Sequence, residues 1–235
     1  MPKAISKSTE LPLKLPHKSI AIIGGVSYLG IIILGIFSEF FVRMQLIIPD
    51  DSTSTLNNLR ASEFLFNLSI ISDILMIALD ITVAWVLYVL LKITNKNLAL
   101  LTAFFRLIHA AVYSAVIMTL IFISLLITDN DYLPEVNNGE LILLLREAHS
   151  YGYDLGLIFF GLHCLLLGYL ISLSNIIPKT IGYLMTAAGL VYLFGSFTRF
   201  ISPDHVEAIS MIYVVALVAE LSMAGWLLVK GSKLP

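Results

Sequence analysis

The chain of 235 residues is 58% hydrophobic and only 13% charged, and its mean hydropathy is +0.93. Because soluble domains average roughly a quarter charged residues, this composition excludes a protein with a large water-facing surface. The net charge of -2 argues against a nucleic-acid partner, and the single cysteine, Cys164, excludes an intramolecular disulfide. We therefore expect the lipid bilayer to be the main solvent and partner of this chain.

Six apolar segments are each long enough to cross a bilayer, which takes about 20 helical residues. They predict an all-α membrane bundle of six transmembrane helices, forming one domain over residues 20–231. A disordered basic tail is expected at residues 1–19, on the cytoplasmic side. The first apolar run is too long for a signal-peptide core, so we expect it to stay as a membrane helix. The predicted spans are residues 19–41, 63–91, 98–128, 141–174, 180–200 and 208–229.

The segments between the spans are polar. A polar loop is predicted at 49–62, a short turn at 92–97 and an acidic loop at 129–140. The next connection is marked by Pro178, and Ser202-Pro203-Asp204 forms the last loop.

The fourth apolar segment is longer than a bilayer requires, and it contains Ser150, Gly152 and Gly156. We expect Ser150-Tyr151-Gly152 to interrupt its helix. Residues 141–149 would then lie near the outer interface as an amphipathic piece.

The lysines predict the orientation of the chain. All nine fall in the tail, the second and fourth loops and the C-terminal segment, which six spans place on one side. Basic residues concentrate in cytoplasmic segments. We therefore predict a multi-pass protein of the cell membrane (plasma or inner membrane) with both termini in the cytoplasm. The lysines are Lys3, Lys7, Lys14, Lys18, Lys92, Lys96, Lys179, Lys230 and Lys233.

Five ionisable residues on four of the predicted helices reach similar depths in the membrane. At a rise of about 1.5 Å per residue they lie about 14 to 18 Å from the cytoplasmic boundary. Charges are costly in lipid unless they are paired or used. We expect these side chains to converge on one buried polar pocket, in which the arginine balances the carboxylates. The set consists of Asp80, Arg106, His109, His163 and Glu220.

A second set of polar residues lies further out, about 28 Å or more from the same boundary. The simplest interpretation makes Glu39 and Arg43 an interfacial ion pair and Tyr153 a belt aromatic. Arg199 would then be a snorkelling side chain at a helix end. The outer set consists of Glu39, Asp73, His149, Tyr153, Asp154 and Arg199.

The deep pocket allows three functional interpretations beside a structural one. His109, His163 and a carboxylate from Asp80 or Glu220 would form a metal site for a membrane-embedded hydrolase. The two histidines could instead hold a b-type haem between two helices. A transporter or proton relay would use intramembrane carboxylates, including Asp73 and Asp154. In a structural role, Arg106 would pair directly with an acid and each histidine would be capped by a neighbour. The sequence identifies neither a cofactor nor an enzymatic activity. A small-molecule or metal ligand is compatible with all the functional interpretations.

Several stretches of the chain together resemble a known family. The string that begins at Tyr151, YGYDLGLIFFGLHCLLLGYLI, is the most specific of them. The others are GIFSEFFVR at 35–43, NKNLALLTAFFRLIHAAV at 95–112 and AELSMAGWLLVKG at 219–231. They are similar to the bacterial integral membrane family called domain of unknown function 4386, over nearly all of residues 20–231. The resemblance implies a small six-helix membrane protein, and it brings no activity and no catalytic residues.

Overall fold

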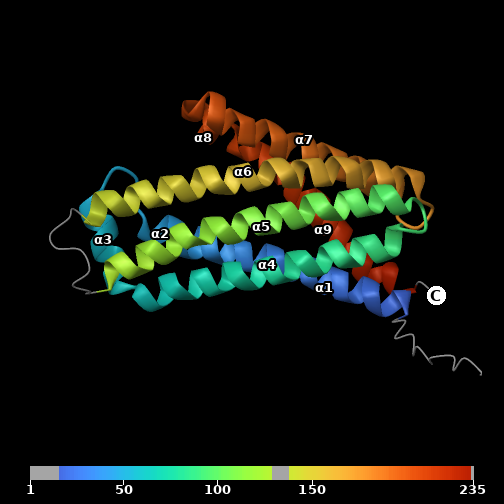
Figure 1. The fold of residues 1–235 in the computed structure, drawn as a ribbon, viewed down its shortest axis with the longest axis horizontal. Helices are drawn as coiled ribbons and strands as arrows, with labels where there is room; N and C mark the ends of the chain where they lie inside the picture. Colours follow the sequence, from blue (N-terminus) through green and yellow to red (C-terminus); the bar gives the residue numbers. More distant parts are fainter. Residues whose placement is uncertain (1–15, 129–137, 234–235) are drawn as a thin grey trace, which may run out of the picture.

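The computed structural model describes residues 16–128 and 138–233, which form helices joined by short turns. Six helical stretches are long and apolar enough to cross a membrane, which confirms the predicted all-α architecture (Figure 1). Most of the predicted tail and most of the predicted acidic loop lie outside the described residues. The six stretches are His17–Leu46, Glu63–Leu91, Lys96–Ile127, Gly139–Leu173, Lys179–Ile201 and Pro203–Val229.

The first and last spans are each assembled from several helical segments. In the first, α1 (His17–Ile36) continues through a π-helical segment (Phe37–Arg43) into α2 (Met44–Leu46). In the last, α8 (Val206–Ile209) leads through a short 3-10 turn into α9 (Tyr213–Val229). The middle spans are single helices, namely α4 (Glu63–Leu91), α5 (Lys96–Ile127), α6 (Asn138–Leu173) and α7 (Lys179–Ile201).

The polar loop predicted at 49–62 contains a further helix, α3 (Ser52–Ala61). Asp51 caps its N-terminus by accepting a hydrogen bond from the backbone N–H of Ser54 at 2.9 Å. Hydrogen bonds from Ser54 also hold the pKa of this exposed carboxyl below its ordinary value. An aspartate followed by small polar residues is an N-cap signal, so the sequence did contain a cue for this helix.

The six spans close into a ring in chain order. α1 packs against α4, α4 against α5, α5 against α6, α6 against α7, α7 against α9, and α9 returns to α1 (Figure 1). The start of α1, the α4–α5 turn, the α6–α7 turn and the end of α9 lie at the same end of the bundle. We call this the lysine end, because the lysines of the described chain belong to these segments. They are Lys18, Lys92, Lys96, Lys179, Lys230 and Lys233.

The predicted interruption of the fourth span is wrong, because α6 is one continuous helix. The Ser150 hydroxyl donates to the backbone carbonyl of Arg146 at 3.2 Å, which a helix accommodates without breaking. Gly152 lies against α5, where an added Cβ would come within 2.5 Å of Cγ2 of Val116. The glycine therefore serves close helix packing rather than a bend.

Buried apolar side chains form two clusters along the ring. One includes Leu87 and Leu167 and extends to the lysine end, and the other includes Leu59, Phe66 and Leu120 on the side of α3. Along α4 and α5, Asp80 and His109 lie between members of the two clusters. His163 and Glu220 lie among members of the first cluster on α6 and α9.

Candidate functional site

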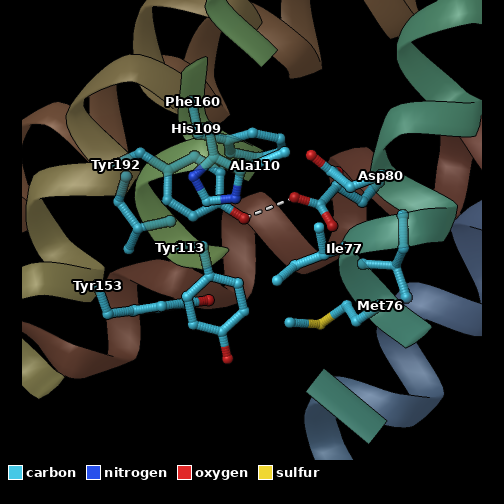
Figure 2. A pocket seen from close by; sticks show the side chains of 12 residues that line it. Met76, Ile77, Asp80, His109, Ala110, Tyr113, Tyr153, Phe160 and Tyr192 are labelled. Atoms are coloured by element: carbon cyan, nitrogen blue, oxygen red, sulfur yellow. Dashed lines mark hydrogen bonds between the residues drawn. The ribbon is translucent and has the colours of Figure 1, made fainter. Parts of the chain in front are cut away.

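A cavity of about 70 Å³ lies inside the helix ring (Figure 2). A water molecule takes up roughly 30 Å³ in the liquid, so the space suits about two waters or a ligand of a few non-hydrogen atoms. All six spans contribute to its wall, which is lined by Ile31, Met76, Ile77, Asp80, His109, Ala110, Tyr113, Tyr153, Leu157, Phe160, Tyr192 and Glu220.

The structure brings the five residues of the deep set to this one region. Asp80, His109 and Glu220 line the cavity itself. Arg106 and His163 lie beside it, and the Arg106 guanidinium links them. Its Nη2 donates to Oδ1 of Asp80 at 2.5 Å, and its Nη1 lies 3.2 Å from Nε2 of His163.

Arg106 is 1% exposed, and its positive charge is neutralised by protein groups. Besides the ion pair with Asp80, its Nη1 donates to the Tyr28 hydroxyl at 3.1 Å. The guanidinium carbon also lies 5.0 Å from the centroid of the Tyr28 ring and 4.9 Å from that of Phe160. Nε of Arg106 and Oδ2 of Asp80 are the two atoms of this pair without a hydrogen-bond partner in the described chain. The ion pair itself joins α4 to α5.

His163 has both ring nitrogens engaged. Nδ1 lies 2.8 Å from the backbone carbonyl of Thr102, which can only accept. Nε2 faces Arg106, which can only donate, so the two contacts together assign the proton to Nδ1. His163 therefore matches the structural interpretation, in which a neighbour caps the histidine.

The hypothesised metal set of His109, His163 and Asp80 is not assembled in this conformation. Within residues 16–128 and 138–233, no group of three or more His, Cys, Asp or Glu side chains could hold a metal ion. The Phe160 ring contacts both imidazoles, with its centroid 4.9 Å from that of His109 and 5.6 Å from that of His163. A haem held by the two histidines would need a slot where this ring packs.

Two buried polar atoms of residues that line the cavity have no side-chain hydrogen-bond partner in the described chain. They are Oδ2 of Asp80 and Nδ1 of His109, on side chains that are 6% and 9% exposed. Glu220 is also buried, and its Oε1 accepts a hydrogen bond from the Tyr192 hydroxyl at 2.6 Å (Figure 2). Glu220 belongs to none of the ion pairs formed by the described residues. The cavity therefore presents hydrogen-bond acceptors and one carboxyl group without a basic partner.

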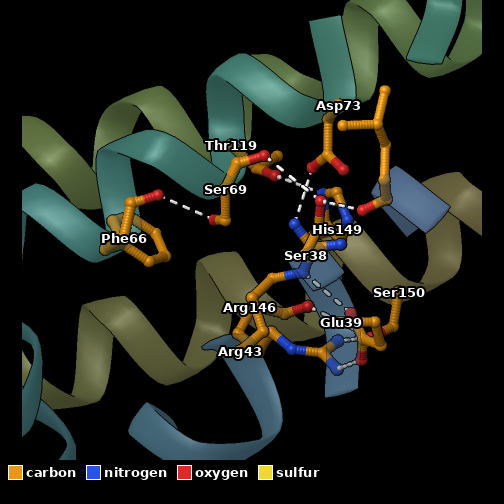
Figure 3. A network of polar contacts seen from close by, with 11 residues as sticks. Ser38, Glu39, Arg43, Phe66, Ser69, Asp73, Thr119, Arg146, His149 and Ser150 are labelled. Atoms are coloured by element: carbon orange, nitrogen blue, oxygen red, sulfur yellow. Dashed lines mark hydrogen bonds and ion pairs between the residues drawn. The ribbon is translucent and has the colours of Figure 1, made fainter. Parts of the chain in front are cut away.

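The outer set separates into different clusters, and Arg43 is the centre of the first (Figure 3). Its Nη1 donates to Oδ2 of Asp73 at 2.6 Å, and its Nε donates to Oε2 of Glu39 at 2.8 Å. Glu39 in turn accepts from Nη2 of Arg146 at 2.9 Å. The structure contains the predicted Glu39–Arg43 pair, in which Arg43 is only 4% exposed. The buried carboxylate of Asp73 draws the guanidinium inward, because it needs a positive partner.

The second outer cluster joins α6 to α7. Nε of Arg199 donates to Oδ2 of Asp154, and Nη1 of Arg199 lies 3.9 Å from Glu147. The guanidinium carbon lies 5.7 Å from the centroid of the Tyr151 ring. Arg199 is therefore a paired side chain between two helices rather than one that snorkels alone.

The last two residues of the outer set belong to a group of aromatic contacts. The ring centroids of Tyr113 and Tyr153 are 5.1 Å apart, and those of Tyr113 and His149 are 6.1 Å apart. Nδ1 of His149 lies 3.4 Å from the hydroxyl of Thr119. Tyr153 lines the central cavity and is also 36% exposed.

Sequence reasoning missed the aromatic part of the site. Tyr28, Tyr113, Phe160 and Tyr192 contact the ionisable groups or line the cavity, and none was predicted. A tyrosine in the middle of an apolar span was the available signal, because its hydroxyl needs a partner where lipid supplies none. Phe160 had no such signal, because a phenylalanine in a span reads as an ordinary lipid or core contact.

Comparison with known proteins agrees with this architecture. Residues 23–231 match the family model described as "Domain of unknown function (DUF4386)". A protein of Archaeoglobus fulgidus described as "Uncharacterized protein" is 34% identical over 176 residues, which cover 73% of this chain and 91% of the relative. No solved structure matches the chain at a significant level. The relative is archaeal, so the similarity extends beyond bacteria. Because the family match runs from α1 to beyond the end of α9, this multi-pass membrane protein belongs to the DUF4386 family.

Proposed function

We propose that this protein binds a small polar solute in the central cavity of its helix ring. The observation that carries the proposal is a wall contributed by all six spans, which includes Glu220 without a basic partner and two residues, Asp80 and His109, that each have a buried polar atom without a hydrogen-bond partner in the described chain. A buried polar group without a partner costs about 1 to 3 kcal/mol. A bound solute that donates hydrogen bonds removes this cost, and at about 70 Å³ the cavity limits the solute to a few non-hydrogen atoms.

Solute binding has better support than the metal and haem interpretations. His163, which both interpretations require, is held by Thr102 and Arg106. The structural interpretation also explains the ion pair of Arg106 and Asp80. His109 and Glu220 are the groups that this structural account leaves unexplained, and both line the cavity.

Transport of the solute is a second candidate, favoured by the position of other charged groups. Asp73 lies two helical turns from Asp80 on α4, in the direction of α3, and contacts Arg43. Glu39, which also pairs with Arg43, is one-third exposed. Carriers bind their substrates near the middle of the membrane. A polar route from the cavity would pass along Asp80, Asp73 and Glu39, each of which is paired with an arginine.

Filling the cavity tests the proposed binding. Ala110 is buried and lines the cavity, whereas its neighbour Ala111 is exposed on the outside of the ring. Ala110→Leu should weaken binding at least tenfold, because its longer side chain occupies the space, and Ala111→Leu should bind like the original protein. The measurement is the thermal stability of the protein in lipid nanodiscs with methylammonium, acetamide or formate.

A solute present at about ten times its dissociation constant should stabilise the folded state by about 1.4 kcal/mol. The proposal fails if none of the three probes stabilises the protein, or if the Ala110 and Ala111 variants respond alike.

A further inference from the structure

We infer that the solute is a small organic cation of the ammonium type, which binds at Glu220 in exchange for a proton. Because this inference assigns a class of ligand to the cavity described above, it rests on the proposed function.

The charges around the cavity favour a cation. Two acids, Asp80 and Glu220, line the wall, and no lysine or arginine does. The charge of Asp80 is balanced by Arg106 at 2.5 Å. Glu220 has only the neutral hydroxyl of Tyr192, which donates to its Oε1 at 2.6 Å. A buried carboxylate without a counter-charge is strongly disfavoured, so Glu220 requires either a proton or a bound cation.

Arg106 is unable to serve an anionic ligand in place of Glu220. Its guanidinium is not part of the cavity wall, and its two Nη atoms are directed at Asp80, Tyr28 and His163. Its Nε has no hydrogen-bond partner in the described chain, but this atom is buried. An anion in the cavity would face two acids and no basic side chain. A neutral solute would leave the proton on Glu220, whereas a cation replaces this proton and pairs with the carboxylate.

The rest of the wall matches an ammonium group. An ammonium has three N–H donors and no acceptor. The Glu220 carboxylate accepts from it, and the unpartnered Oδ2 of Asp80 and Nδ1 of His109 belong to residues of the same wall. Four aromatic rings complete the wall, and a desolvated cation is attracted to the face of such a ring. The aromatic rings belong to Tyr113, Tyr153, Phe160 and Tyr192.

The exchange conserves charge inside the cavity. Without ligand, Glu220 is a neutral carboxylic acid. When an alkylammonium ion enters, the O–H bond of Glu220 breaks, the proton leaves to the solvent, and the carboxylate pairs with the ammonium. One positive charge enters and one leaves, no covalent bond of the ligand changes, and no redox partner is needed. Binding of the cation is therefore linked to release of one proton.

Glu220 is the group whose charge changes, because its neighbours are already balanced or neutral. Asp80 and Arg106 compensate each other, and tyrosine and cysteine side chains stay neutral near pH 6. His109 also lines the cavity, and the variant His109→Gln tests its contribution to proton release separately. The titratable groups that face Glu220 from the other helices are Tyr28, Asp80, Arg106, Tyr153, Cys164 and Tyr192.

The test is isothermal titration calorimetry of methylammonium into the protein in nanodiscs between pH 5.5 and 7.5. Titrations in two buffers of different ionisation enthalpy count the protons, and we expect release of about one proton per ligand bound. Methylammonium stays charged over this range, since alkylammonium groups titrate near pH 10. A rising pH removes the competing proton, so the dissociation constant should fall by up to about tenfold per pH unit.

Variants identify the residue that releases the proton when the ligand binds. Glu220→Gln should abolish proton release and the pH dependence, whereas Glu207→Gln, at an exposed acid on α8, should retain both. His109→Gln should weaken binding and still release a proton. If Glu220→Gln does not fold, the proton count of the unchanged protein still decides the question.

The outcomes separate the inference from the proposed function. Methylammonium that binds without proton release overturns the exchange, and the cavity remains a binding site. Proton release that survives in Glu220→Gln and disappears in His109→Gln overturns the role of Glu220. Sodium ions that displace a proton as effectively as methylammonium overturn the organic class of the cation. Acetamide or formate that binds better than methylammonium overturns the cationic class. Only a protein that binds none of the probes contradicts both proposals.

Discussion

At the scale of single residues, Arg106 links the polar side chains at the centre of the molecule. Its guanidinium contacts Tyr28 on α1, Asp80 on α4 and both His163 and Phe160 on α6, while the residue itself belongs to α5. These partners are all buried, so water is unable to replace Arg106 as their contact. Removal of one charge therefore leaves the other buried without a partner.

Breaking this ion pair on one side should be more harmful than removing it entirely. Arg106→Met should destabilise the protein by about 3 to 5 kcal/mol, because Asp80 keeps a buried carboxyl group without its counter-charge. The double variant Arg106→Met with Asp80→Asn should recover a substantial part of this loss. Arg60→Met, at an exposed arginine on α3, is the matched control and should change little.

Unfolding of the original protein, Arg106→Met, Asp80→Asn and the double variant in mixed micelles, analysed as a double-mutant cycle, gives the coupling energy between Arg106 and Asp80. Additive losses in the double variant would show that the pair contributes no coupling.

Glycines hold α6 and α7 together at the scale of elements. A Cβ on Gly168 would lie 2.6 Å from the carbonyl oxygen of Gly182, and one on Gly182 would lie 2.9 Å from that of Gly168. Two turns away the same reciprocal contact recurs, with 3.1 Å at Gly161 and 2.8 Å at Gly189. Small residues let membrane helices approach closely, which increases van der Waals contact between them. This seam fixes the position of α7, and with it the position of Tyr192 on the cavity wall.

The same substitution at two glycines separates packing from helix propensity. Gly168→Ala should destabilise the protein by about 1 to 3 kcal/mol, because its methyl group has no space between α6 and α7. Gly225→Ala should be neutral or stabilising, since an added Cβ at Gly225 meets nothing within 4 Å and alanine favours a helix. Thermal unfolding of both variants in the same detergent makes the comparison. Equal stability of the two variants would show that the seam is not tightly packed.

At the scale of the whole molecule, the described lysines gather at one end of the bundle. The described lysines lie at the end of the bundle that contains the start of α1 and the end of α9 (Figure 1). The opposite end contains α3. This segregation is the basis for the predicted orientation, in which the lysine end faces the cytoplasm.

Reporter fusions test this orientation directly. A reporter fused after Pro235 should be active in the cytoplasm, and one inserted near Asn137 should be active outside, because six spans separate the lysine-rich tail from the end of the chain and three separate it from this insertion point. Replacing Lys92 and Lys96 with glutamine should lower the fidelity of the orientation. Two reporters that respond on the same side would contradict the prediction.

The sequence by itself determined the number of spans, their limits to within a few residues, and the depth of each ionisable group. These properties are local. A run of apolar residues becomes a helix because lipid offers its backbone no other partners, and the fixed rise per residue converts sequence position into depth. Asp80, His109 and Glu220 could therefore be assigned to one level before any helix was placed beside another.

Only the tertiary structure decided which groups meet at that level. Arg106 pairs with Asp80 rather than Glu220, and its contact with Tyr28 joins residues 78 positions apart. Arg43 is buried against Asp73, and α6 stays straight through Gly152 because α5 packs there. Depth follows from one helix alone, whereas partners depend on how every helix is rotated about its axis. That rotation is set by packing between helices distant in sequence, and the order of apolar residues along a single span contains little information about it.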